Sequence, residues 1–196
     1  IFEELKAFRG TNNEVVIFRP EENFKRMQLS AERMCMPPVT KEIFLDGMLE
    51  LLRLDRNWIP GGDLSSLYIR PFQFASDEFL GVQPAETYKF MIVLSPSGAY
   101  YSKPLSLKVE THYTRAAQGG TGAAKAAGNY AGSLYPAKLA KEAGYDQLLW
   151  TDSQEHKYIE EAGTMNVMLI KDGVAITPAL TDSILPGVNR KSVVAV

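Results

Sequence analysis

A glycine-rich segment, residues 119–130, holds the residues with the clearest potential for chemistry, Lys125 and Tyr130. Its glycines permit tight turns and let the backbone pass close to a ligand. A lysine sheltered among small, uncharged residues is poorly hydrated, which favours its free amine as a nucleophile or base. A Gly/Ala loop with a solvated lysine explains the same residues equally well. The segment alone leaves both interpretations open.

The segment does not match a nucleotide-binding P-loop. That motif needs Gly-Lys-Ser/Thr after a buried strand, because the hydroxyl binds magnesium and the lysine reaches the phosphates. Here Lys125 lies between Ala124 and Ala126, and the preceding residues 114–118 do not form a hydrophobic strand. We therefore exclude this motif.

Composition and charge narrow the class of protein. The chain has 196 residues, of which 45% are hydrophobic and 22% charged, which is typical of one large globular domain or two modest ones. A net charge of -2 gives no electrostatic case for binding nucleic acid. No apolar run approaches the roughly 20 residues that span a bilayer, and the charged residues within positions 1–10 argue against a signal peptide. We expect neither nucleic acid nor membrane as a partner.

The cysteine and histidine content argues against disulfide and metal chemistry. The single cysteine, Cys35, excludes an internal disulfide framework and a cysteine-based zinc site. With only His112 and His156, a His-rich metal site is not expected either. The sequence therefore predicts no metal and a reducing compartment, the cytoplasm or an organelle matrix, of which we expect the cytoplasm.

The sequence pattern of the first half of the chain predicts a small α/β domain, in which Tyr68 and Arg70 lie close together. The expected strands are residues 5–8, 14–18, 66–74 and 87–94, and the expected helices begin at Pro20 and at Lys41, the second ending near Asp55. Thr40 is the expected N-cap of the second helix, and Met34 is expected to face the core from the first. Because side chains alternate along a strand, Tyr68 and Arg70 should point to the same face.

Residues 95–103 are rich in serine, proline and glycine, and we place a linker there. The expected domains are residues 1–94 and 104–196. In the second, we expect strands at 105–110 and 147–150, a helix at 130–143 ended by Gly144, a hairpin of 165–170 with 174–177, and a turn into a helix at 184–190. The fold class is mixed α and β in two lobes.

Several ordered motifs together resemble the branched-chain amino-acid aminotransferase family, which belongs to the fold-type IV pyridoxal-phosphate enzymes. They are Lys125-Ala-Ala-Gly-Asn-Tyr130, Glu161-Ala-Gly-Thr-Met-Asn166, Leu185-Pro-Gly-Val188, Phe2-Glu3, Ser66-Leu-Tyr-Ile-Arg-Pro71, and Phe18-Arg-Pro20 ahead of Arg26-Met27. The resemblance covers essentially the whole chain. It implies ping-pong transamination of leucine, isoleucine and valine with 2-oxoglutarate, giving branched-chain 2-oxo acids and L-glutamate.

The resemblance implies pyridoxal 5′-phosphate as cofactor and gives its contacts. Lys125 would form the Schiff base and move the proton, Glu161 would face the pyridine nitrogen, and Tyr130 would bond the 3′-oxygen. Arg26 and the backbone amides of Val188 and Asn189 would hold the phosphate. Thr164 and Gly187 would make the remaining contacts with the cofactor. Without the family, Arg26 reads as an exposed helix residue, and Glu160-Glu161 as a solvated acidic pair.

The resemblance also implies a substrate pocket and a partner subunit. The substrate side chain would be surrounded by Phe2, Tyr68, Arg70, Tyr130 and Thr164. Aromatic walls with one positioned arginine can accept both an apolar branched chain and the carboxylate of glutamate. The segment Leu80-Gly81-Val82 resembles the loop that reaches the neighbouring subunit's pocket, which places Val82 of a partner subunit at the site and implies a homodimer.

The sequence departs from the family pattern in two places and leaves alternatives open. Glu4 stands where the family usually has the glycine of Phe-Glu-Gly, and Ala127 stands where it usually has glycine. Family members also extend beyond both ends of these 196 residues. D-amino-acid aminotransferases and aminodeoxychorismate lyases share the lysine and glutamate, but generally lack the Tyr-Ile-Arg-Pro and Gly-Asn-Tyr motifs. A non-catalytic fragment that folds or binds phosphate is the third alternative.

Overall fold

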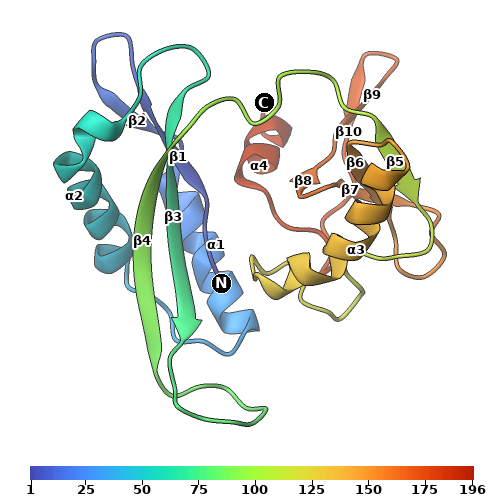
Figure 1. Ribbon diagram of the computed structural model, residues 1–196, viewed down its shortest axis with the longest axis horizontal. Helices are drawn as coiled ribbons and strands as arrows, with labels where there is room; N and C mark the ends of the chain where they lie inside the picture. Colours follow the sequence, from blue (N-terminus) through green and yellow to red (C-terminus); the bar gives the residue numbers. More distant parts are fainter. The chain divides into compact units, whose positions relative to one another are not determined.

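The computed structural model describes residues 1–196, which divide into two compact units, Ile1–Ser102 and Lys103–Val196 (Figure 1). Strand β4 (Tyr88–Ser97) continues into the segment expected to be a linker. The domain limits at residues 94 and 104 therefore stay a prediction. No helix in either unit is long and apolar enough to cross a membrane.

The N-terminal unit contains an antiparallel sheet in the order β2-β1-β3-β4. Its other strands are β1 (Leu5–Arg9), β2 (Val15–Ile17) and β3 (Ser66–Ala75). An isolated bridge between Phe2 and Phe72 extends the pairing of the chain's first residues with β3. The four strands expected in this unit are confirmed, and in β1 and β3 alternate residues, Leu5 and Ala7 with Leu67 and Ile69, are buried in the core with the helices.

Helices pack against one face of this sheet. They are α1 (Pro20–Arg33), the π-helical turn η1 (Glu42–Asp46), α2 (Gly47–Leu54) and the 3-10 turn η2 (Arg56–Trp58). Met27 of α1 and Met48 of α2 join Leu67 and Ile69 of β3 in the core. The expected position of Met34 in the core is wrong, because α1 ends at Arg33 and leaves Met34 38% exposed.

The expected helix from Lys41 is confirmed with one irregularity. Thr40 accepts a hydrogen bond at Oγ1 from the amide of Ile43 at 3.3 Å, which is the predicted N-terminal cap. The first turns, Glu42–Asp46, are π-helical rather than α-helical. The wider turn is compatible with full burial of Phe44 in the core.

The C-terminal unit is built on a four-stranded sheet in the order β5-β6-β7-β8. The strands are β5 (Leu107–Glu110), β6 (Gln147–Thr151), β7 (Ile159–Ala162) and β8 (Met165–Asn166). β5 and β6 are parallel and are joined through α3 (Gly128–Glu142), so the glycine-rich segment connects the end of β5 with the start of a helix. Ala140 of α3 packs against Leu148 and Trp150 of β6.

The expected strand 165–170 is wrong, because it divides into two short strands with different partners. β8 pairs with β7, whereas β9 (Leu169–Lys171) forms a separate hairpin with β10 (Val174–Ile176). The Asp172-Gly173 turn of that hairpin is confirmed, and both residues have positive φ, as a two-residue hairpin loop requires. The last helix is α4 (Val188–Val194).

Candidate active site

The loop that carries Lys125 is fastened to the first turn of α3. The side-chain amide of Asn129 donates to the carbonyl oxygens of Thr121 at 2.7 Å and Ala124 at 2.8 Å. The Thr121 hydroxyl donates to Asn129 Oδ1 at 2.6 Å. One asparagine side chain therefore fixes the backbone immediately before Lys125. Lys125 itself is buried, with only 4% of the residue exposed.

A second attachment joins the same loop to residues 182–183. The amide of Ala123 donates to the carbonyl oxygen of Asp182 at 2.8 Å. At Gly122, a Cβ atom would lie 2.6 Å from the carbonyl oxygen of Ser183, so only glycine permits this close approach. The glycines thus let the loop pack against another segment, rather than making it flexible.

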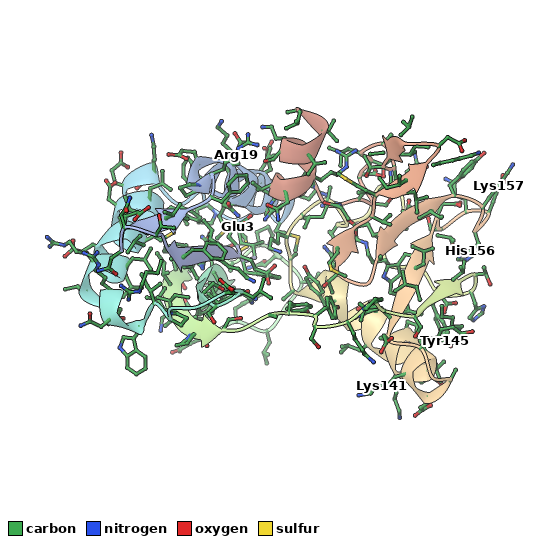
Figure 2. The ribbon with its side chains drawn as sticks, turned by 90° about the horizontal axis from the view of Figure 1, so that it is seen from above. Glu3, Arg19, Lys141, Tyr145, His156 and Lys157 are labelled. Atoms are coloured by element: carbon green, nitrogen blue, oxygen red, sulfur yellow. The ribbon has the colours of Figure 1, made fainter.

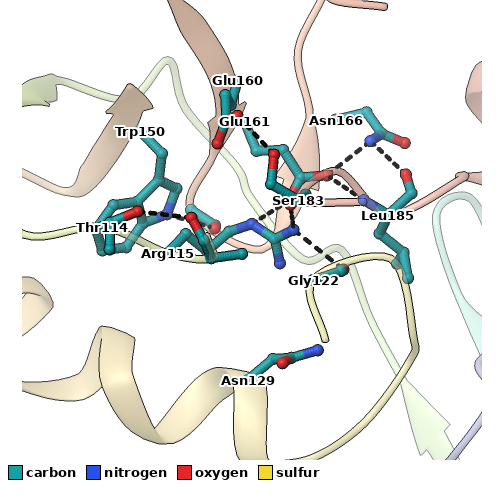
Figure 3. Close-up of polar contacts among 12 residues, drawn as sticks. Thr114, Arg115, Gly122, Asn129, Trp150, Glu160, Glu161, Asn166, Ser183 and Leu185 are labelled. Carbon is teal, nitrogen blue, oxygen red and sulfur yellow. Dashed lines mark hydrogen bonds and ion pairs between the residues drawn. The ribbon is translucent and has the colours of Figure 1, made fainter. Parts of the chain in front are cut away.

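Glu161 on β7 is a buried carboxylate that is bound by residues of three other segments (Figure 3). Its Oε2 lies 2.6 Å from Arg115 Nε, and the two side chains are 3% and 9% exposed. Its Oε1 accepts from the side-chain amide of Asn166 at 2.8 Å and from the backbone amide of Leu185 at 3.2 Å. One guanidinium and two hydrogen-bond donors, from three separate segments, therefore converge on one buried carboxylate.

Arg115 connects this carboxylate with the loop that carries Lys125. Its Nη2 donates to the carbonyl oxygen of Gly122 at 3.2 Å and also to that of Ser183. Figure 3 shows the guanidinium between Glu161, Ser183 and Gly122. Sequence reasoning missed this residue, because nothing local distinguishes an arginine in a polar segment from a solvated one.

The protonation of Glu161 is set by two opposing influences. Burial raises the pKa of its carboxyl above the ordinary value, because a charge is poorly solvated inside the protein. The Arg115 guanidinium acts in the other direction and lowers the pKa by stabilising the carboxylate. The net direction is a raised pKa, so this carboxyl depends on its partners to stay ionised.

The adjacent carboxylate, Glu160, is bound differently. It accepts a hydrogen bond from the Ser183 hydroxyl at 2.6 Å. Neighbouring strand residues point to opposite faces, so only one of the two glutamates can face Arg115. The geometry therefore supports the choice of Glu161 over Glu160.

A small pocket in the C-terminal unit brings several expected residues together. Its lining residues are Arg115, Asn129, Tyr130, Ser133, Glu161, Gly163, Thr164 and Leu185. Tyr130, Glu161 and Thr164 thus share one pocket, as expected, whereas Lys125 and residues 187–189 are not among its lining. The enclosed volume is about 10 Å³, which is room for about one water molecule.

The turn expected to bind phosphate lies beside the same carboxylate network. Gly187 is the N-cap of α4, Val188 is its first residue, and Asn189 is exposed. A Cβ atom on Gly187 would collide with the side chain of Asn166, which itself donates to Glu161. The glycine therefore allows the start of α4 to approach Asn166, which binds Glu161.

The N-terminal unit brings together the residues expected to contact the substrate side chain. The Arg70 guanidinium carbon lies 4.3 Å from the centroid of the Phe2 ring, and Arg70 Nε donates to the Tyr68 hydroxyl at 2.9 Å. Glu4 contributes a carboxylate to the group, 3.0 Å from Arg70 Nη2. Burial raises the pKa of the Tyr68 hydroxyl, and its hydrogen bond to Glu4 raises it further.

Arg26 is not the exposed helix residue that its local pattern suggests. Its Nε and Nη2 atoms donate to the two carboxylate oxygens of Glu3 at 2.8 and 2.7 Å, and Glu3 is fully buried. Figure 2 shows Glu3 inside the N-terminal unit, among other side chains. The ion pair explains the burial of Arg26, and its role toward phosphate stays a prediction.

The loop between β3 and β4 carries the residue expected to reach a partner subunit. Asp77 accepts hydrogen bonds from the amides of Glu86 and Thr87, both at 2.6 Å, and so closes the base of the loop. Beyond that base, Leu80 and Val82 are fully exposed. An apolar loop tip held out from its own unit fits the expected contact with a second subunit, which stays a prediction.

The chain matches the model of the amino-transferase class IV family over residues 1–196, and it belongs to that family. It is 49% identical over 198 residues to branched-chain-amino-acid transaminase 1 of Bacillus subtilis, which covers 99% of this chain and 56% of that protein. It is 50% identical over 198 residues to a probable branched-chain-amino-acid aminotransferase of Staphylococcus epidermidis, with 99% and 55% covered. The chain thus spans about half the length of these curated relatives.

A solved structure gives the same picture at the level of the fold. The crystal structure of the T.th. branched-chain amino acid aminotransferase with pyridoxamine 5′-phosphate superposes with a TM-score of 0.83 at 28% identity. The match covers 100% of this chain and 63% of that one. The expected mixed α and β fold of class IV aminotransferases is confirmed.

Proposed function

We propose that this chain carries the cofactor and substrate residues of a transaminase that uses pyridoxal 5′-phosphate. The reaction moves the amino group of leucine, isoleucine or valine to 2-oxoglutarate and yields a branched-chain 2-oxo acid and L-glutamate. The observation that supports this most directly is the buried Arg115–Glu161 pair in a pocket wall shared with Tyr130 and Thr164. Two curated relatives are named as a branched-chain-amino-acid transaminase and a probable branched-chain-amino-acid aminotransferase, which supports this class of substrate.

The residues present fit this cofactor. A buried carboxylate with an arginine partner suits a protonated ring nitrogen, and a buried lysine in a rigid loop suits attachment of an aldehyde. The similar T.th. enzyme was crystallised with pyridoxamine 5′-phosphate. When bound, the cofactor supplies a ring that accepts electrons from the substrate Cα.

The chain's own residues would bind, orient and move the proton. Glu161 would hold a proton on the ring nitrogen, and Arg115 would keep its carboxylate ionised. Lys125 would take the proton from the substrate Cα with Nζ. Tyr130 would bond the 3′-oxygen, and the phosphate would be held by Arg26 and by the segment Gly187-Val188-Asn189.

Five residues would contact the substrate side chain, namely Phe2, Tyr68, Arg70, Tyr130 and Thr164. We propose that Val82 of a partner subunit completes this pocket in a homodimer. Sedimentation equilibrium of the complete protein tests the dimer.

Reduction of the complete, pyridoxal-phosphate-loaded protein with sodium borohydride tests the lysine assignment. The reduced cofactor should be found on Lys125 by peptide mapping, and Lys125→Arg should abolish the transfer from L-leucine to 2-oxoglutarate. Lys141→Arg is the matched control, because Lys141 is exposed on α3 (Figure 2). Label on a different lysine would refute the assignment. Activity with D-alanine and none with L-leucine would refute the substrate class.

A further inference from the structure

The start of the chain places a carboxylate opposite the arginine of the expected substrate site. Leu5 pairs with Ile69 in the antiparallel register, which sets Glu4 opposite Arg70 on the same face of the sheet. Glu4 Oε1 lies 3.0 Å from Arg70 Nη2 and accepts from the Tyr68 hydroxyl at 2.7 Å. Glycine, the usual residue of the similar motif, could make neither contact.

These contacts engage an edge of the guanidinium that could grip a ligand. Arg70 Nε donates to the Tyr68 hydroxyl at 2.9 Å, while Nη2 reaches Glu4. An arginine recognises a carboxylate through two parallel N–H donors, and Nε with Nη2 form one such pair. A ligand carboxylate at this edge therefore has to displace Glu4 or share the guanidinium with it.

The pair is accessible enough for such an exchange. The Arg70 side chain is 33% exposed and that of Glu4 is 43% exposed. Ion pairs with this degree of exposure add little net stability, because water solvates both charges when they separate. The Phe2 ring holds the guanidinium through its face at 4.3 Å, so Arg70 keeps a contact when Glu4 moves away.

We propose that Glu4 is a specificity-determining residue, which occupies Arg70 as a built-in carboxylate and disfavours ligands with a distal carboxylate. This inference rests on the proposed function. An apolar branched side chain needs only the aromatic walls and leaves the Glu4–Arg70 pair intact. A dicarboxylate must break that pair and also meets the negative charge of Glu4. Glu4 therefore shifts the balance between the two half-reactions toward the branched-chain ligand.

Two unreactive acids separate the two ligand classes. Glutarate carries a distal carboxylate, whereas 4-methylvalerate carries a branched apolar end. Their inhibition constants are measured on the loaded complete protein with L-leucine as the varied substrate, and their dissociation constants by calorimetry. Glu4→Gln retains the size of the side chain and an acceptor for Tyr68, and removes the charge.

In Glu4→Gln, glutarate should bind about three- to tenfold more tightly, as expected from loss of a half-exposed charge. Binding of 4-methylvalerate should change by less than about twofold. Glu50→Gln is the matched control, since it removes the carboxylate of another arginine pair, with Arg53 on α2, and should change neither constant. Adding Arg70→Met to Glu4→Gln should remove the gain for glutarate.

The sign of the effect decides the proposal. If Glu4 aims Arg70 at the ligand, Glu4→Gln weakens glutarate binding, and the proposal is wrong. Equal changes for both acids, or a gain that persists without Arg70, also overturn it. If the wild type transaminates leucine, but the ratio of glutarate to 4-methylvalerate binding is the same in Glu4→Gln as in the wild type, this inference alone is refuted. Absence of transamination in the wild type refutes the proposed function instead.

Discussion

Replacing Arg115 with methionine should leave Glu161 protonated over a wider range of pH. The two side chains are 9% and 3% exposed and lie 2.6 Å apart. Burial raises the pKa of Glu161, and Arg115 is the foremost influence that lowers it. An opposite charge this close to a carboxylate typically lowers its pKa by about one to three units.

The pH dependence of activity should therefore move toward higher pH. The proposed mechanism needs an ionised Glu161, so activity is full above the pKa of this carboxyl and falls as the pH drops through it. Loss of Arg115 raises that pKa, and the acid limb should shift upward by about one unit or more. The free energy of unfolding should also depend on pH. Because the pKa of Glu161 is raised in the folded protein, the protonated carboxyl stabilises the fold at low pH, and this stabilisation is lost as the pH rises through the folded pKa.

The assay is kcat/KM for L-leucine between about pH 5 and pH 9, together with urea unfolding of each variant. Arg115→Lys retains the charge and should shift the acid limb less than Arg115→Met. Lys138→Met is the matched control, because it removes an exposed charge that pairs with Glu142 on α3, and it should shift nothing. A folded Arg115→Met protein with the acid limb of the wild type would refute the reasoning.

Two further changes test the packing that supports these sites. Glu3→Gln should lower the free energy of unfolding by about 3–5 kcal/mol, because it leaves the Arg26 charge buried without its partner, and urea unfolding measures this loss. A loss below about 1 kcal/mol, the value for an exposed pair, would show that the two side chains separate readily. Gly122→Ala should cost about 1–3 kcal/mol because its Cβ would meet Ser183, whereas Gly128→Ala, with open space around it, should be neutral or stabilising. Equal thermal shifts for the two alanines would contradict this account of the loop.

Elements that depend on local signals could be predicted from the sequence. Pro20 marks the start of α1, because proline fits the first helical turn, and Thr40 caps the next helix through its hydroxyl. Asp172-Gly173 specifies the turn between β9 and β10 through its backbone conformation. Each of these signals is contained within a few residues, so no distant contact is needed to interpret it.

Features that depend on distant partners could not be predicted in this way. The acidic pair Glu160-Glu161 gives no sign of a strand, yet it lies on β7, because Ser183 and Arg115 from other segments bind the two carboxylates. Burial of Arg26 likewise requires Glu3, which precedes β1 in the sequence. A single sequence contains no information on which arginine meets which glutamate.

Three of the arginine–glutamate pairs nevertheless follow one physical rule, which separates fixed charges from exchangeable ones. In the Glu3–Arg26 pair the side chains are 0% and 10% exposed, and in the Glu161–Arg115 pair 3% and 9%, so separating either pair leaves a charge inside the protein. The Glu4–Arg70 pair is 43% and 33% exposed, and water can solvate both of its members. The buried pairs can therefore hold a charge in place through many turnovers, whereas the exposed pair can trade its own carboxylate for that of a ligand.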